Sequence, residues 1–304
     1  MNITKDMFEK IPQTEEAVDN IVRPSITYWQ DSWRRLKQNK VAIISLIIMS
    51  ILIIMCIIGP ILSPYSHEVV DPSNINAFPS AKHWFGTDSL GRDVFTRVWI
   101  GGRTSILIGF IGTIVAIFIG CVYGGVAGYF GGKVDLFMMR IIEILVSIPY
   151  LIMVILVSLY LGKGMFSLII ALTITGWTEI ARIVRGQVLQ IKEQEFVTAA
   201  QSLGASPTRI IVKHLLPNTI GVVIIAITFK IPGLIFSEAF LSFIGLGVQA
   251  PNTSWGALAS AARENLRFYP YQLFFPALMI ILTMLSFSLL GDGLRDALDP
   301  KERQ

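Results

Sequence analysis

The sequence predicts an all-α integral membrane protein with six transmembrane helices, both termini in the cytoplasm, and a helix-turn-helix in the loop between spans four and five. Its 304 residues are 53% hydrophobic and 15% charged, whereas soluble domains carry about 25% charged residues. A helix rises about 1.5 Å per residue, so roughly 20 apolar residues cross a hydrocarbon core about 30 Å thick. Four stretches without Asp, Glu, Lys or Arg are long enough to cross: 41–66, 104–130, 144–162 and 268–291.

Two further spans contain charged residues. The uncharged stretch 164–178 is short for a span, so a helix there has to continue past Glu179 towards the interface. The stretch 219–250 is long and apolar but contains Lys230 and Glu238. Counting both gives six spans, and a soluble protein is not expected to bury several helices of this length completely.

The distribution of Lys and Arg indicates the orientation. With the N-terminus inside, the cytoplasmic segments carry more than twice as many of these residues as the outside segments, in agreement with the positive-inside rule. The sequence RRLKQNK at 34–40 anchors the start of the first span. Just before it, Tyr28, Trp29 and Trp33 suit a helix at 25–40 that lies on the membrane surface.

Turn residues and charge divide the chain into five parts. Prolines and glycines after the first span predict an extracytoplasmic flap whose ordered part is HWFGTDSLGRDVF at 83–95. In span two, Gly120, Gly124 and Gly128 favour close packing against another helix, or a moving helix interface. The parts are a cytoplasmic leader with an interfacial helix at 1–40, the first transmembrane helix at 41–63, the flap at 64–103, a five-helix core at 104–294 with a cytoplasmic loop at 190–217, and a cytoplasmic tail at 295–304.

Missing motifs argue against several chemistries. No G-x-x-x-x-G-K-[ST] sequence occurs, so we expect no ATP site of the P-loop kind. Neither H-E-x-x-H nor C-x-x-C is present, and the topology puts His67, His83 and His214 on both sides of the membrane, which argues against a shared metal site. The net charge of +4 follows from the orientation and requires no nucleic acid. We therefore expect no enzyme activity, no bound cofactor or metal, and no nucleic-acid partner.

Charged residues inside the spans are the remaining candidates for chemistry at membrane depth. A charge at a helix centre costs about 2.5–3.5 kcal/mol on insertion scales and is a functional hypothesis by default. Lys230 and Glu238 lie about 12 Å apart along one helix, too far to pair directly. Each could line a polar translocation path; alternatively, Lys230 reaches the interface or pairs with another helix. Arg140 and Glu143 are spaced for a local ion pair.

The polar cytoplasmic segment between spans four and five is patterned as two short helices. Phe196, Ala199, Ala200 and Leu203 follow the i, i+3, i+4, i+7 spacing of one helical face. Gly204 stands where a helix C-terminal glycine is expected. The first helix therefore presents a face of small and apolar side chains and ends in a bend.

A second short helix is expected after the bend. Ser206 precedes Pro207, the combination expected for an N-cap followed by proline at the first helical position. The helix continues past Ile211 and is expected to end at Pro217. Such a bent pair is a plain connector, a DNA-reading element, or a knob that docks into a groove of a soluble partner. The missing basic recognition face disfavours DNA, and the patterning favours the knob.

The same segment resembles the EAA loop of permease subunits of ABC importers. That loop has the pattern Glu-Ala-Ala, three residues, Gly, nine residues and Ile-x-Leu-Pro. Thr198 stands in place of the Glu, and His214 stands in place of the Ile. The positions that match are Ala199, Ala200, Gly204, Leu216 and Pro217.

Three further stretches are similar to the oligopeptide, dipeptide and nickel permeases, specifically the C-type member of the permease pair. They are 83–106, EAFLSFIGLGVQAPNTSWG at 238–256 and GDGLRDALDPK at 291–301. The resemblance covers nearly everything after residue 35. It implies a multi-pass protein of the bacterial plasma membrane that forms a heterodimer with a B-type permease. It also implies two cytoplasmic subunits that use ATP and Mg, and an extracytoplasmic peptide-binding protein.

The resemblance implies a coupling role for the patterned loop, which would sit in a cleft of one ATPase. It favours oligopeptides over dipeptides or nickel chelates, because the stretch 174–205 is most similar to the oligopeptide subgroup. The alternative is a stand-alone secondary transporter in which Lys230 and Glu238 couple transport to an ion. The residues expected to dock on the ATPase are Phe196, Ala199, Ala200, Leu203, Gly204, Ser206, Pro207, Ile211 and Pro217.

Overall fold

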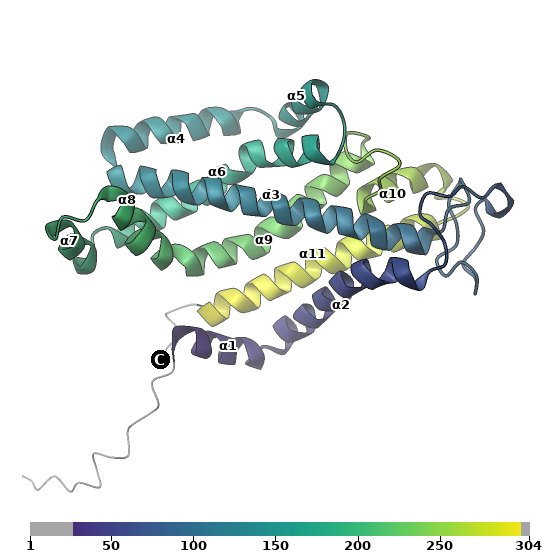
Figure 1. Ribbon diagram of the computed structural model, residues 1–304, viewed down its shortest axis with the longest axis horizontal. Coiled ribbons are helices and arrows are strands. Elements are labelled where there is room, and N and C mark those ends of the chain that lie inside the picture. Colours follow the sequence, from purple (N-terminus) through teal and green to yellow (C-terminus); the bar gives the residue numbers. More distant parts are fainter. Residues whose placement is uncertain (1–26, 299–304) are drawn as a thin grey trace, which may run out of the picture.

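The computed structural model describes residues 27–298, and over this range the chain is helical (Figure 1). These residues form one isolated β-bridge, between Thr87 and Asp93, and no strand. Most of the predicted leader and the end of the predicted tail lie outside them. The α-helices are α1 Tyr28–Gln38, α2 Lys40–Leu62, α3 Val94–Phe130, α4 Gly132–Ser147, α5 Tyr150–Leu161, α6 Met165–Ile191, α7 Glu195–Ser202, α8 Pro207–Ile210, α9 Leu216–Phe243, α10 Trp255–Ala262 and α11 Tyr271–Leu298.

Six spans are present if one bent helix pair counts as a single span. Within residues 27–298, α2, α3, α6, α9 with the turns before it, and α11 are each long and apolar enough to cross a membrane. The pair α4 and α5 passes the same test together but bends by 83°. The predicted third span, 144–162, is therefore not one straight helix. Pro149 disfavours helical backbone at Ile148, whose ψ is 123°, so the helix stops and restarts.

Close packing of α3 on α6 forms the centre of the bundle. Gly124 and Gly128 face α6, and a Cβ added at Gly124 would lie 2.3 Å from the carbonyl oxygen of Ala181. Such a distance is possible only because glycine has no side chain, as the glycine spacing predicted. Helix α3 begins at Val94, since Asp93 caps it by accepting from the Thr96 amide at 2.9 Å. The last ten residues of the predicted flap, 94–103, therefore belong to this helix.

The segment between α2 and α3 is folded against the start of α11. The hydroxyl of Tyr271 donates to the carbonyl oxygens of Ala77 and Thr87, both at 2.9 Å. At the edge of this segment, Ser73 and Asn74 donate to the Asp71 carboxylate, which lowers the pKa of that carboxyl below its usual value. The flap is therefore an ordered cap on one end of the bundle.

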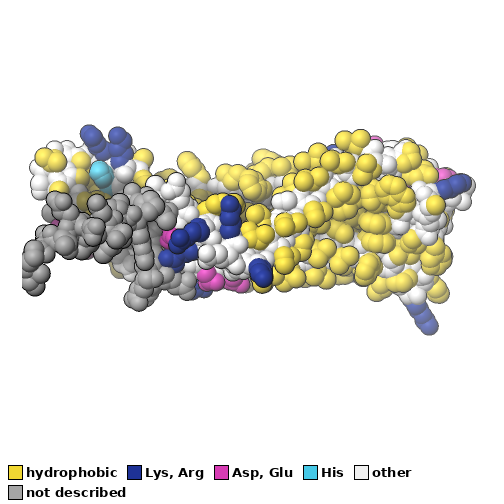
Figure 2. Space-filling view, turned by 90° about the horizontal axis from the view of Figure 1, so that it is seen from below, with side chains coloured by type: hydrophobic (Ala, Val, Ile, Leu, Met, Phe, Trp, Pro, Cys, Tyr) yellow, Lys and Arg dark blue, Asp and Glu magenta, His cyan; other side chains and the backbone are white. Residues whose placement is uncertain are grey.

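The two ends of the bundle carry different elements. Helices α7 and α8 project at the end where α11 finishes and α1 lies, whereas the flap and α10 occupy the opposite end (Figure 1). This arrangement agrees with a position of the patterned loop and the end of α11 on the same side of the membrane. Which side that is stays a prediction. In Figure 2, hydrophobic side chains form a broad band across the visible face, and Lys and Arg lie on either side of this band. This distribution is typical of a lipid-facing belt.

Helix α10 packs on the bundle through its apolar face. The Trp255 side chain is completely buried, and its indole nitrogen donates to the carbonyl oxygen of Val98 at 2.9 Å. Leu258 and Ala262 are buried on the same face. The apolar face of α10 thus packs inward on α3, α9 and α11, because it finds protein side chains to bury against at the end of the bundle.

Candidate functional site

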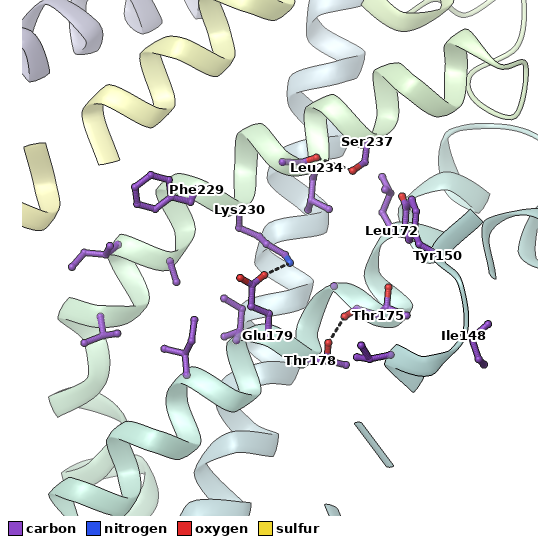
Figure 3. Close-up of a pocket in the computed structure, with 18 of the residues that line it drawn as sticks. Ile148, Tyr150, Leu172, Thr175, Thr178, Glu179, Phe229, Lys230, Leu234 and Ser237 are labelled. Atoms are coloured by element: carbon purple, nitrogen blue, oxygen red, sulfur yellow. Dashed lines mark hydrogen bonds and ion pairs between the residues drawn. The ribbon is translucent and has the colours of Figure 1, made fainter. Parts of the chain in front are cut away.

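A cavity of about 890 Å³ lies between helices that are long and apolar enough to span a membrane. Its walls come from three places: the break between α4 and α5, the middle of α6, and the middle of α9 (Figure 3). The break at residues 147–149 contributes directly to the wall, so the proline that divides the third span also shapes the cavity. Most of the lining is apolar, with Arg295 at its edge.

An ion pair lies on the cavity wall. The Lys230 ammonium on α9 contacts the Glu179 carboxylate on α6 at 3.0 Å, and Figure 3 shows the two side chains pointing towards each other. The Lys230 side chain is 17% exposed and that of Glu179 is 68% exposed. Lys230 therefore pairs with another helix, which is one of the alternatives that the sequence left open, and it also lines the cavity. That this cavity belongs to a translocation path stays a prediction.

Hydroxyl groups complete the polar part of the wall. Thr178 donates to the carbonyl oxygen of Thr175 at 2.7 Å, and Ser237 donates to that of Gly233 at 2.8 Å. Tyr150, the first residue of α5, lies beside Ser237 and Leu172 in the same wall (Figure 3). Each of these hydroxyl groups is thus already hydrogen-bonded to a backbone carbonyl of its own helix.

Glu238, the other charged residue of α9, lies outside this cavity and is completely buried. Its two carboxyl oxygens accept hydrogen bonds from Ser105 on α3 and Ser242 on α9, both at 2.7 Å. The structure therefore does not bring Lys230 and Glu238 to one surface. Glu238 joins two helices, and Lys230 faces the cavity.

The hydrogen bonds around Glu238 extend to α10. The Trp255 amide donates to the Ser105 hydroxyl at 3.2 Å, and the Val248 amide donates to the Ser242 hydroxyl at 3.2 Å. A Cβ added at Gly256 would lie 2.4 Å from backbone atoms of Ala239, so α10 touches α9 backbone to backbone. We call Ser105, Glu238, Ser242 and the start of α10 the Glu238 cluster.

The patterned loop forms a bent knob at the other end of the bundle. Helix α7 ends before Gly204, whose φ of +77° is the left-handed conformation that favours glycine. Ser206 then caps α8 by accepting from the Arg209 amide at 3.4 Å, and Pro207 is the first helical residue. On the face of α7 that the sequence singled out, Phe196, Ala199 and Leu203 are exposed and Ala200 is half-buried, and Thr198 is exposed as well.

The second helix of the knob is not short, which corrects the expectation that it ends at Pro217. The backbone stays helical from Pro207 to Phe243, with a π-helical turn at Ile211–Leu215. In this turn the Leu216 amide donates to the backbone carbonyl of Ile211, and the Asn218 side-chain amide donates to the backbone carbonyl of His214. The widened turn and the Asn218 side-chain donor replace the hydrogen bonds that Pro217 cannot make. The helix therefore continues through Pro217.

Buried side chains fix the knob to the bundle. Val197 on α7, Ile210 on α8 and Leu215 in the π-helical turn are completely buried. They pack with Ile180 and Val184 of α6, and Val223 of α9 belongs to the same cluster. The knob is therefore packed onto α6 and α9, the two helices that carry the ion pair.

Two of these residues were not singled out from the sequence. Val197 lies about 100° around α7 from Phe196, to one side of the predicted docking face, and its apolar side chain beside the polar Thr198 was the available signal. Glu179 was treated only as a charge that ends a short apolar stretch. Charged residues inside spans commonly pair with one another, so Glu179 was one possible partner of Lys230, but the choice among the other spans depends on how the helices pack. By contrast, the expected pair of Arg140 and Glu143 is present on α4 at 2.7 Å.

Comparison with known proteins places the chain in a family. Residues 112–304 match the family model of the binding-protein-dependent transport system inner membrane component. Residues 27–79 match that of the N-terminal TM domain of oligopeptide transport permease C. A chain of the MetNI methionine ABC transporter, in inward-facing conformations, has a similar fold, with a TM-score of 0.54, 22% identity, and coverage of 66% of this chain and 97% of that chain.

Curated relatives align over almost the whole chain. The dipeptide transport system permease protein DppC of Bacillus subtilis is 53% identical over 96% of this chain and 92% of its own. The oligopeptide transport system permease protein OppC of the same organism is 48% identical over 100% of this chain and 99% of its own. OppC of Escherichia coli strain K12 is 43% identical over 90% and 92%.

These matches confirm the resemblance and the plasma-membrane location, and they give no support to a stand-alone secondary transporter. Subunits of this kind are transport channels, so membership also confirms that the chain is not itself an enzyme. With its all-helical spans, the chain belongs to the inner-membrane permease family of binding-protein-dependent ABC transporters.

Proposed function

We propose that this chain forms, with a B-type permease subunit, the path of an ATP-driven importer for peptides, with oligopeptides favoured over dipeptides or nickel chelates. The observation that carries the proposal is the packing of the knob on the helix bundle. Val197, Ile210 and Leu215 join it to α6 and α9, and the same two helices wall the cavity. A movement imposed on the knob therefore changes the cavity.

The knob is the docking element for one of two cytoplasmic ATPase subunits. Its exposed side chains, Phe196 and Leu203, offer apolar area to a groove, the helix-in-groove mode of recognition. ATP and Mg are used on those partner subunits, and this chain binds no cofactor. Closure of the ATPase pair shifts the knob, α6 and α9 follow, and the path opens outward. An extracytoplasmic peptide-binding protein then releases its cargo into it, and the flap with α10 forms the surface it meets.

Peptides suit the cavity because it combines apolar wall with one pair of opposite charges. Of the two charged residues on α9, Lys230 belongs to the path, and Glu238 supports it from outside as a joint between helices. The names of the relatives divide between dipeptides and oligopeptides, and the family model of the N-terminal part is named for oligopeptides. A cavity of about 890 Å³ accommodates either.

The docking proposal is tested by changing the bend of the knob. Proline cannot adopt the positive φ of Gly204, whereas asparagine tolerates it. We expect Gly204→Pro to lower ATP-dependent uptake by about tenfold or more, and the matched Gly204→Asn variant to lose much less. Co-purification of the ATPase subunits measures docking directly. Full uptake by Gly204→Pro, or a complex that never contains an ATPase, would overturn the proposal.

The substrate is tested by uptake of labelled peptides of two to six residues into vesicles that contain the assembled complex. Oligopeptides should be taken up at rates at least equal to dipeptides when the binding protein is saturated with each. Uptake of dipeptides alone would replace oligopeptides by dipeptides in the proposal. Uptake of no peptide at all would overturn the peptide assignment.

A further inference from the structure

We propose that the pair of Lys230 and Glu179 is a receiving site for the charged ends of a passing peptide, with Glu179 taking the terminal ammonium and Lys230 the terminal carboxylate. The inference rests on the proposed function and adds a specificity to it: peptides with free termini pass this subunit faster than peptides with blocked termini.

The position of the pair carries the first step. Lys230 is near the middle of α9 and Glu179 is in the second half of α6, so both lie at membrane depth, on the cavity wall. Among the described residues that line this cavity, the ionisable charges are these two and Arg295 near the end of α11. The pair is thus the place in this wall where both signs of charge meet.

The Glu179 carboxylate is open to the cavity. The Glu179 side chain is 68% exposed, so its carboxylate is accessible from the cavity while it holds Lys230. An ion pair with one partner open to water is held more weakly than an enclosed pair, because the Glu179 carboxylate keeps much of its hydration. A lysine ammonium also has three N–H donors, so contact with one carboxylate does not exhaust it. The pair can open for a second set of charges at low cost.

Charge balance carries the third step. A free peptide brings one ammonium and one carboxylate, and exchange replaces the pair of Lys230 and Glu179 by two pairs of the same kind. No net charge enters the apolar part of the wall, where an uncompensated charge is costly. A peptide with one end blocked leaves either Lys230 or Glu179 without its exchange partner. Blocking an end therefore slows the passage of the peptide at this wall.

Peptide length adds a further distinction. An extended chain spans at most about 3.3–3.6 Å per residue, so the ends of a dipeptide can reach both side chains of an opened pair together. In a longer peptide the two ends meet the site one after the other. Blocking one end should accordingly slow a dipeptide more than a hexapeptide of similar composition.

The experiment uses the whole complex, reconstituted in vesicles with its binding protein and ATP. Uptake is measured for one peptide sequence in three forms: free, N-acetylated and C-amidated. The affinity of the binding protein for each form is measured separately, and uptake is compared at saturation. The wild-type complex should prefer the free form by about two- to fivefold, the range that a water-exposed charge pair supplies.

Each variant should remove one half of this preference. Glu179→Gln should abolish the preference for the free peptide over the N-acetylated peptide and keep the preference for the free peptide over the C-amidated peptide. Lys230→Met should keep the first preference and abolish the second. The double variant Lys230→Met, Glu179→Gln leaves no unpaired charge and should lose both preferences. A matched control, Arg140→Met with Glu143→Gln, removes an exposed pair of α4 that lies outside the cavity and should keep both.

A merely structural role for the pair would change uptake of all three forms by the same factor and leave their ratios unchanged. Unchanged ratios in all three cavity variants would overturn the inference while peptide transport itself stands. Equal uptake of the three forms by the wild-type complex would overturn it too. Failure of the wild-type complex to transport any form would instead contradict the proposed function, so the two failures are distinguishable.

Discussion

Helix α9 carries two ionisable side chains in opposite surroundings. Lys230 faces a cavity and pairs with an opposite charge on α6. Glu238, about two turns further on, is completely buried and is held by the hydroxyls of Ser105 and Ser242. Lys230 is open to the cavity, whereas Glu238 is enclosed by protein.

Helix geometry explains why two charges on one span do not share a surface. Each residue turns a helix by about 100°, so the step from Lys230 to Glu238 ends about 80° away from a whole number of turns. The two side chains therefore face different neighbours, α6 for Lys230 and α3 for Glu238. An intramembrane charge is thus a functional hypothesis only after its face of the helix is known.

The largest effect should follow from removing the enclosed carboxyl. Glu238→Leu keeps the volume but leaves the Ser105 and Ser242 hydroxyls without their acceptor, and a buried polar group left without a partner costs about 1–3 kcal/mol. We expect a clear fall in the unfolding temperature of the purified complex in detergent. Protection of the α10 amides from hydrogen exchange should fall with it, because the Trp255 amide donates to Ser105.

Glu238→Gln is the matched control, since its amide keeps an acceptor and a similar shape. It should remain closer to the wild-type protein in both measurements. If Leu and Gln at position 238 proved equally stable, hydrogen bonding would not be what holds α3, α9 and α10 together. Lys230 and Glu238 would then differ only in how exposed their side chains are.

A smaller effect should follow from one extra methyl group at the Glu238 cluster. Gly256→Ala puts a Cβ 2.4 Å from backbone atoms of Ala239, which forces α10 away from α9. Overpacking of this kind costs about 1–3 kcal/mol. The control is Gly186→Ala on α6, where an added Cβ meets nothing within 4 Å and alanine is the better helix former. Equal unfolding temperatures for both variants would show that α10 is not seated tightly.

Much of the fold follows from local sequence. Charge-free stretches locate the spans. The spacing of Gly124 and Gly128 predicts a close helix contact, which α3 makes with α6. Helix α8 begins at Pro207 after the Ser206 cap, as expected. The effects of Pro149 and Pro217 on the helices were harder to predict. Pro149 breaks a span, whereas Pro217 lies inside continuous helix, because a preceding π-helical turn accommodates it. Proline shows where a helix is perturbed, and the surrounding hydrogen bonds decide the outcome.

The candidate site follows from the sequence only in part. Exposed Phe196 and Leu203 on the knob were visible in the helical spacing. The partners of Lys230 and Glu238 were not, since Glu179 and Ser105 are far away in sequence and meet them only through helix packing. Spacing along one span gives the faces of that span, and the choice of partner depends on the angle and depth at which a second helix crosses.

The smallest effect on stability should come from the cavity pair. Lys230→Met removes an ion pair whose carboxylate partner is 68% exposed, and such pairs contribute about 0–1 kcal/mol. The unfolding temperature should therefore change little, and the small difference from wild type should shrink further at high salt, because ions screen an exposed pair. A double-mutant cycle with Glu179→Gln measures the interaction itself and should give less than about 1 kcal/mol. A loss as large as that of Glu238→Leu would show that the pair of Lys230 and Glu179 is also a joint between helices. A small loss combined with altered uptake of blocked peptides would separate the two regions of α9 by role, one for the solute and one for the fold.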